Sequence, residues 1–191
     1  MKKLTLFVAL LVVATGLAEA QNLPAKKEIM DKMVLANAYF MKKWPDTGKT
    51  IITNKERPSN IWTRAVYYEG LMALYSVNPD KAYYNYAMSW GDAHKWGLNG
   101  GVKNRNADNH CCGQTYLDLY EKEKNPEMIK DLKESIDLMI ASDKIDDWTW
   151  IDALQMGMPV FAKLSVITGD KKYSERMYQM YMDSKVRQGF Y

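Results

Sequence analysis

Two acidic stretches hold the residues best suited to chemistry. The first reads ADNHCCGQTYLDLY over residues 107–120 and contains Asp108 and His110, while the second reads DDWTWIDALQ over residues 146–155 and contains Asp152. Positioned carboxyl groups are common general acids and bases, which donate and accept protons during bond cleavage. The two stretches therefore predict acid–base chemistry that depends on Asp108 and Asp152.

Tryptophans precede the second aspartate. Trp148 and Trp150 lie four and two positions before Asp152. A carboxyl group among indoles loses hydration, so its pKa rises toward the range of a proton donor at neutral pH. We therefore expect Asp152 to be a proton donor, whereas the neighbouring Asp146 and Asp147 are expected to be exposed.

A structural explanation is also open for the two aspartates. Asp108 and Asp152 each lie near the expected start of a helix. There, an aspartate side chain commonly accepts hydrogen bonds from unpaired backbone N–H groups. Helix capping does not exclude catalysis, so the sequence leaves both roles open.

Cysteine and histidine are too few to suggest a metal centre. The cysteines are Cys111 and Cys112, and the histidines are His94 and His110. Neighbouring cysteines on one helix point about 100° apart and pair poorly, which argues against a disulfide scaffold. Without a Cys-x-x-Cys pair, zinc ligands are scarce. We expect no metal, and we expect the cysteines to be small buried residues.

Residues 1–20 resemble a secretory signal peptide. Two early lysines precede an apolar run, and small residues precede a cleavage point after Ala20, so the mature protein would begin at Gln21. The apolar run is shorter than the roughly 20 residues of a membrane span. We expect an exported protein, periplasmic or secreted, without a membrane anchor. The formal charge of the whole chain is only +3, which gives no reason to expect a nucleic-acid partner.

The elements that position the aspartates are expected to be helices. Amphipathic segments separated by turn signals predict helices at about 26–44, 60–77, 79–95, 108–124, 126–142, 151–168 and 170–184. Asn78-Pro79 and Asn125-Pro126 are typical helix starts, and Gly169-Asp170 is typical of a helix end followed by a new start. Pro159 should make the helix around it irregular, because proline has no N–H to donate to Gln155. The fold class is therefore all-α, built from helical hairpins.

The hairpins repeat in sequence. Gly70, Gly113 and Gly157 lie 43 and 44 residues apart, each in the first helix of a hairpin. The residues four positions after these glycines are Leu74, Leu117 and Phe161. Aligned apolar positions of this kind predict a shared buried stripe.

The same alignment brings the two aspartates into register. Asp108 and Asp152 lie five positions before the second and third glycine, and Ala65 occupies that position in the first repeat. If equivalent helices stand side by side, their starts emerge at the same end of the assembly. Asp108 and Asp152 should therefore face one common mouth.

Three motifs resemble a known enzyme family. The segments RAVYYEGLMALY (64–75), ADNHCCGQTYLDLY (107–120) and WTWIDALQMGMPVFAKL (148–164) resemble the unsaturated rhamnogalacturonyl hydrolases, glycoside hydrolase family 105, which is related to family 88. The resemblance implies an (α/α)6 barrel with its active site at the starts of the inner helices. Since about seven helices of the family's twelve are predicted, residues 21–191 are interpreted as the N-terminal part of the catalytic domain.

The resemblance also implies an activity. The family removes a 4,5-unsaturated galacturonic acid from pectin-derived oligosaccharides by hydrating a vinyl ether, and it needs no cofactor. By this resemblance Asp152 is the general acid and base, Asp108 the second acid, and Trp150 the platform on which the sugar stacks. His110, Trp62 and Trp148 are further candidates for substrate contact.

Three other functions remain open. An unsaturated glucuronyl hydrolase would perform the same hydration on disaccharides derived from glycosaminoglycans. A non-catalytic, exported glycan-binding or partner-binding helical repeat would use its tryptophans as platforms, namely Trp62, Trp96, Trp148 and Trp150. A sugar epimerase is disfavoured, because such enzymes commonly use several histidines and this chain has two. The sequence assigns no oligomeric state.

Overall fold

The computed structural model describes residues 23–189, so the expected signal peptide and the cleavage point after Ala20 lie outside the described residues. The chain divides into two compact units, Met1–Ala36 and Asn37–Tyr191. The described part of the first unit is the beginning of helix α2 (Lys26–Lys43). Its exposed surface carries ion pairs one helical turn apart, Lys27 with Asp31 and Glu28 with Lys32.

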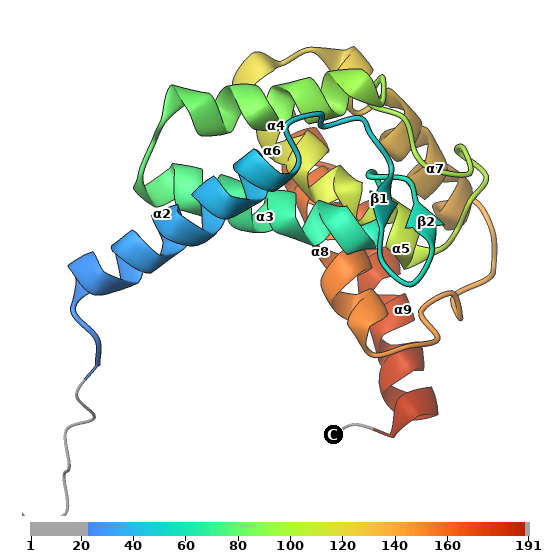
Figure 1. Cartoon of the computed structure of the whole chain (residues 1–191). Coiled ribbons are helices and arrows are strands. Elements are labelled where there is room, and N and C mark those ends of the chain that lie inside the picture. Colours follow the sequence, from blue (N-terminus) through green and yellow to red (C-terminus); the bar gives the residue numbers. More distant parts are fainter. Residues whose placement is uncertain (1–22, 190–191) are drawn as a thin grey trace, which may run out of the picture. The chain divides into compact units, whose positions relative to one another are not determined.

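The second unit is mostly helical (Figure 1). After α2 come α3 (Trp62–Val77), α4 (Lys81–Ala93), α5 (Ala107–His110), α6 (Cys112–Glu123), the 3-10 turn η1 (Pro126–Met128), α7 (Lys130–Ile140), α8 (Asp152–Thr168) and α9 (Lys172–Gln188). The strands β1 (Ile51–Ile52) and β2 (Glu56–Arg57) form one short antiparallel hairpin. The prediction of an all-α fold is confirmed. Within residues 23–189, no helix is both long and apolar enough to cross a membrane.

Successive helices pack as hairpins. Helix α3 packs against α4, and α8 packs against α9. The first helices of the hairpins also contact one another, α3 with α6 and α6 with α8, and the short α5 contacts both α3 and α8. This row of first helices brings the starts of α5 and α8 together, as the register of the repeats predicted.

The repeat correctly predicted the buried apolar stripe, but its three glycines do not share one packing role. Leu74, Leu117 and Phe161 are all buried, with at most 2% of their surface exposed. A Cβ atom added to Gly113 would lie 2.6 Å from Leu132, and one added to Gly157 would lie 2.8 Å from Trp148. A Cβ atom on Gly70, by contrast, would meet nothing within 4 Å. Two of the three glycines therefore permit close packing, whereas the third faces open space.

Some predicted helix boundaries need correction. The helix expected over 108–124 is divided at Cys111 into α5 and α6. The start predicted at Asn78-Pro79 is wrong, because Asp80 caps α4 by accepting a hydrogen bond from the backbone N–H of Ala82 at 2.8 Å. Asn125-Pro126 does start an element, although that element is η1, and α7 follows only from Lys130.

Helix α8 continues through Pro159 from Asp152 to Thr168. The carbonyl of Gln155, which lacks its usual helical partner, accepts a hydrogen bond from Nε2 of Gln114 on α6 at 2.9 Å. A side chain from the neighbouring helix thus replaces the missing N–H. The contact between α6 and α8 therefore includes a hydrogen bond that depends on the proline.

Candidate active site

A cleft of about 450 Å³ opens where α5 and α8 begin. It is lined by Trp62, Arg105, Asn106, Ala107, Asp108, Lys144, Asp146, Asp147, Thr149, Trp150, Asp152 and Ala153. We call it the aspartate cleft. It brings together Asp108 and Asp152, which are 44 positions apart in the sequence. The repeat predicted that these two residues would face one common mouth.

Neither aspartate caps its helix through its side chain. Asn106 caps α5, because its Oδ1 accepts a hydrogen bond from the backbone N–H of Asp108 at 2.8 Å. Asp152 is the first residue of α8, and Ile151 before it provides no side-chain cap. The capping explanation is therefore wrong for both carboxylates. Each is left available to the cleft.

The charges in the cleft act most clearly on Asp108. Burial raises the pKa of the Asp108 carboxyl, the negative charge of Asp152 raises it further, and the Arg57 guanidinium on β2 opposes these effects. Two like charges that share a site favour the retention of a proton. These surroundings therefore keep the Asp108 carboxyl protonated up to a higher pH than an ordinary aspartate.

The expectation that indoles surround Asp152 is wrong. Asp152 is exposed, and Trp148 is fully buried, with its ring edge-on to Phe161 at 5.7 Å between centroids. Trp148 also packs on Gly157, so it belongs to the core and cannot be the sugar platform that the sequence suggested. Trp150 is 75% exposed and Trp62 is partly buried, and both line the cleft.

His110 likewise lies in the core and not on the cleft surface. Its Nε2 lies 2.9 Å from Oγ of Ser135, whose hydroxyl donates in turn to the carbonyl of Asn104 at 3.1 Å. Because the serine proton is used on Asn104, Nε2 of His110 must be the protonated nitrogen of a neutral ring. Burial lowers the pKa of His110 to about 4. The expected direct contact between His110 and substrate is therefore corrected to a structural role.

Sequence reasoning missed an ion pair at the edge of the cleft. Nε and Nη2 of Arg105 donate to the two carboxylate oxygens of Asp147 at 2.8 and 2.6 Å. Only 4% of the Asp147 side chain is exposed, although the sequence suggested an exposed carboxylate. The two residues are 42 positions apart, and no motif marks them as partners.

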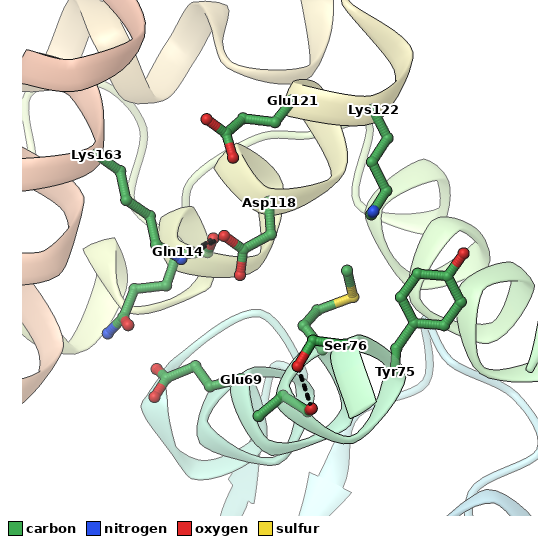
Figure 2. Close-up of a pocket in the computed structure, with 10 residues that line it drawn as sticks. Glu69, Tyr75, Ser76, Gln114, Asp118, Glu121, Lys122 and Lys163 are labelled. Carbon is green, nitrogen blue, oxygen red and sulfur yellow. Dashed lines mark hydrogen bonds and ion pairs between the residues drawn. The ribbon is translucent and has the colours of Figure 1, made fainter. Parts of the chain in front are cut away.

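A second polar pocket, also of about 450 Å³, lies along α3, α6 and α8 (Figure 2). We call it the inner-helix pocket. Three of its charged groups have partners: Lys163 pairs with Asp118 and also donates to the carbonyl of Gln114, and Glu69 accepts a hydrogen bond from Gln155 at 2.6 Å. Within residues 23–189, no group of three or more histidine, cysteine or acidic side chains is arranged so that it could hold a metal ion.

The cleft thus holds Asp108, Asp152 and the exposed indole of Trp150 where neighbouring helices of the hairpin array begin. The family model described as Glycosyl Hydrolase Family 88 matches residues 32–187. The chain belongs to this family. The match names family 88, the related family, and does not separate it from the family 105 suggested by the motifs.

The similar solved structures include the following two. One, titled a polysaccharide lyase, has a TM-score of 0.73 and 25% sequence identity, with 84% of this chain and 46% of that chain covered. The other, a glycosyl hydrolase family 88 protein from Bacteroides vulgatus, has a TM-score of 0.75 and 24% identity, with 85% of this chain and 48% of that chain covered. The chain thus spans about half the length of these structures. A search of curated proteins gave no match.

Proposed function

We propose that the protein is a glycoside hydrolase that removes a 4,5-unsaturated galacturonic acid from pectin-derived (rhamnogalacturonan) oligosaccharides by hydrating the vinyl ether. The observation that carries the proposal is the pair of carboxyl groups in the aspartate cleft, Asp108 and Asp152, beside the exposed indole of Trp150. Membership of a glycoside hydrolase family supports the reaction class. The motifs of the sequence support the substrate class.

The reaction needs one proton at the start and returns it later. A carboxylic acid protonates C4 of the double bond, water adds to C5 and gives up a proton to the carboxylate, and the resulting hemiketal opens and expels the aglycone. Two carboxyl groups in one cleft can meet both requirements, because one can donate the proton and the other can accept one. In this proposal Asp152 touches C4, and Asp108, whose pKa is raised, keeps the proton within the pair.

The residues around the pair suggest how the sugar is held. Trp150 offers an exposed ring for stacking. The uronate carboxylate needs a cation, and Arg105 is already committed to Asp147. Lys144 is the other cation lining the described cleft, and its Nζ lies 3.6 Å from Oδ1 of Asp146 and 3.6 Å from Oδ1 of Asp147, so both ion pairs are longer than a close hydrogen bond. We propose that Lys144 contacts the substrate carboxylate.

The family match favours a second candidate substrate. Because the matching family is 88, an unsaturated glucuronyl group from a glycosaminoglycan disaccharide is the alternative to a galacturonyl group from pectin. Both reactions destroy the C4=C5 chromophore, so both can be followed as a loss of ultraviolet absorbance. The expected export of the protein would place it where such polysaccharide fragments occur.

The test compares kcat/KM for the two unsaturated disaccharides with the same protein sample. The proposal expects absorbance to fall with both, and faster with the rhamnogalacturonan fragment. A preference for the glycosaminoglycan fragment would replace the first substrate by the second. An increase in absorbance with saturated polysaccharide would indicate elimination, and an unchanged signal together with binding would indicate a non-catalytic protein.

A further inference from the structure

Two chain segments bring the candidate acids to the cleft, and neither acid is held through its own carboxylate. Asp108 follows the segment 104–106, and Asp152 follows the loop 141–151. No side chain in residues 23–189 forms a hydrogen bond or an ion pair with either carboxylate. The separation of the two carboxylates therefore depends on the backbone that carries them, through the packing of α5 against α8 and through the segments that lead to the two helices.

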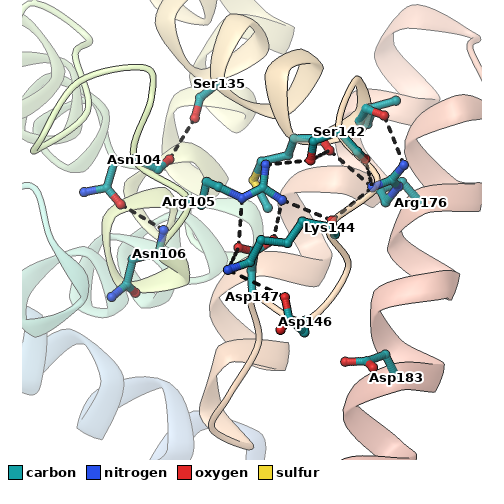
Figure 3. A network of polar contacts seen from close by, with 12 residues as sticks. Asn104, Arg105, Asn106, Ser135, Ser142, Lys144, Asp146, Asp147, Arg176 and Asp183 are labelled. Atoms are coloured by element: carbon teal, nitrogen blue, oxygen red, sulfur yellow. Dashed lines mark hydrogen bonds and ion pairs between the residues drawn. The ribbon is translucent and has the colours of Figure 1, made fainter.

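Arg105 joins these two segments (Figure 3). Besides its two hydrogen bonds to Asp147, it donates from Nη1 to Oγ of Ser142 at 3.0 Å and from Nη2 to the carbonyl of Lys144 at 3.1 Å. All three guanidinium nitrogens thus donate to the loop before α8. A bidentate pair with a nearly buried carboxylate fixes orientation as well as distance.

The other end of this connection is also fixed. Arg105 lies directly before Asn106, the cap of α5. Oδ1 of Asn104 accepts a hydrogen bond from the backbone N–H of Asn106 at 2.8 Å, and Ser135 donates to the carbonyl of Asn104 at 3.1 Å. The backbone of Arg105 is therefore held between two anchored residues. Its side chain transmits that position to Asp147, which lies five residues before Asp152.

We propose that Arg105 is a positioning residue, which sets the separation of the Asp108 and Asp152 carboxylates by pairing with Asp147. The effect of this positioning on catalysis rests on the function proposed above. The geometric statement is independent of activity and can be measured on the protein without substrate. Four of the five N–H donors of Arg105 bind the loop, so we assign its effect to the position of the two aspartates and not to contact with the substrate.

A second arginine provides a matched control. Arg176 on α9 donates to four carbonyls around the start of the same loop, those of Met139, Ile140, Ser142 and Lys144, at 2.8–3.2 Å. It makes no hydrogen bond to segment 104–106. If Arg105 merely kept the loop folded, replacing Arg176 would have the same effect.

The experiment measures the electrostatic coupling of the two aspartates by ¹³C NMR titration of their side-chain carboxyl carbons. The pKa of Asp108 is determined with and without Asp152→Asn, in wild type, in Arg105→Lys and in Arg176→Lys. The charged groups that face Asp108 closely enough to shift its pKa are Asp152 from α8 and Arg57 from β2. Each comparison is made within one background, so the direct charge effect of either arginine cancels.

In wild type, Asp152→Asn should measurably lower the pKa of Asp108, because a nearby negative charge is removed. In Arg105→Lys, which keeps the charge but loses the bidentate fork, this decrease should shrink by at least about half. In Arg176→Lys it should stay as in wild type. An equal decrease in all three backgrounds, or an equal loss in both arginine variants, would overturn the positioning role.

Folding and function are separated by two further measurements. Circular dichroism establishes that each variant is folded. If Arg105→Lys is not, Asp147→Asn breaks the same pair from the other side and should give the same loss of coupling, and full coupling in that variant overturns the proposal. Failure of the wild-type protein to consume unsaturated disaccharides would sink the proposed function but leave the coupling result intact. Absence of coupling in wild type would remove the basis of the positioning role.

Discussion

Two pockets of similar volume lie on the same row of helices, and two carboxylates of the one differ from two of the other in whether they have partners. In the inner-helix pocket, Asp118 has a lysine partner, and Glu69 accepts hydrogen bonds from Gln155 and from the Cys111 thiol. In the aspartate cleft, Asp108 and Asp152 have no such partners within the described residues and repel each other. Satisfied carboxylates stabilise a fold, whereas an unpaired, mutually repelling pair costs stability and is a candidate for chemistry.

A raised pKa alone would not distinguish the two pockets. Burial raises the pKa of Glu69 as well, although the hydrogen bonds from Cys111 and Gln155 act in the opposite direction. The difference lies in the partners. Glu69 has both carboxylate oxygens occupied by protein donors, whereas Asp108 faces another acid. The comparison therefore rests on geometry, and mutations can test it at both places.

The largest expected difference concerns catalysis. Asp152→Asn removes the proton donor but keeps the side-chain size, so kcat should fall about 10²- to 10⁴-fold with KM nearly unchanged. Asp118→Asn makes the same chemical change in the inner-helix pocket and should leave kcat within about twofold, because Asp118 is paired for the fold. Steady-state loss of ultraviolet absorbance measures both. Comparable losses in the two variants would erase the distinction between the pockets.

An intermediate effect is expected at the exposed indole. Trp150→Ala should raise KM about tenfold and change kcat little, because a stacking platform holds substrate and transition state alike. Trp150→Phe retains a ring and should recover most of the affinity. The same assay measures both variants. A kcat loss as large as that of Asp152→Asn, with KM unchanged, would place the indole in the chemical step instead.

The smallest expected effect concerns thermal stability, where substitutions in the two pockets should change Tm in opposite directions. The folded-state pKa of Asp108 is raised, so its contribution favours folding below its ordinary value of 3.8 and is lost as the pH rises. At pH 7, Asp108→Asn should therefore raise Tm by roughly 1–2 °C, and the gain should vanish near pH 3.5. Asp118→Asn should lower Tm at pH 7 by a similar amount, because it loses a partly exposed ion pair. Thermal unfolding followed by circular dichroism checks the two signs, and a destabilised Asp108→Asn at pH 7 would contradict the account.

The fold was predictable because helix periodicity and the repeat carry most of its information. Leu74, Leu117 and Phe161 mark one buried stripe at repeat spacing, and burying that stripe requires the helices to stand side by side. That arrangement in turn places Asp108 and Asp152 at one cleft. Local capping was less predictable, since Asn78 and Asp80 are both residue types that cap helices well and the structure uses Asp80.

The details of the site depended on contacts that no local pattern encodes. Trp148 and Trp150 are two residues apart, yet one fills the space above Gly157 and the other faces solvent. The side-chain direction in the irregular loop before α8 follows no fixed period, so the sequence assigned both to substrate. The pairing of Arg105 with Asp147 joins residues far apart in sequence. Predicting this pair would require knowing which loops lie next to each other in the fold.

The most direct test of the central claim is the fate of the double bond in deuterated water. The protein is incubated with an unsaturated galacturonyl disaccharide in D2O, and the product is examined by NMR. Proton transfer to C4 by the carboxyl pair predicts one deuterium at C4 together with loss of the C4=C5 double bond, and neither should occur with Asp152→Asn combined with Asp108→Asn. Release of the aglycone with the double bond intact and C4 free of deuterium would contradict the account.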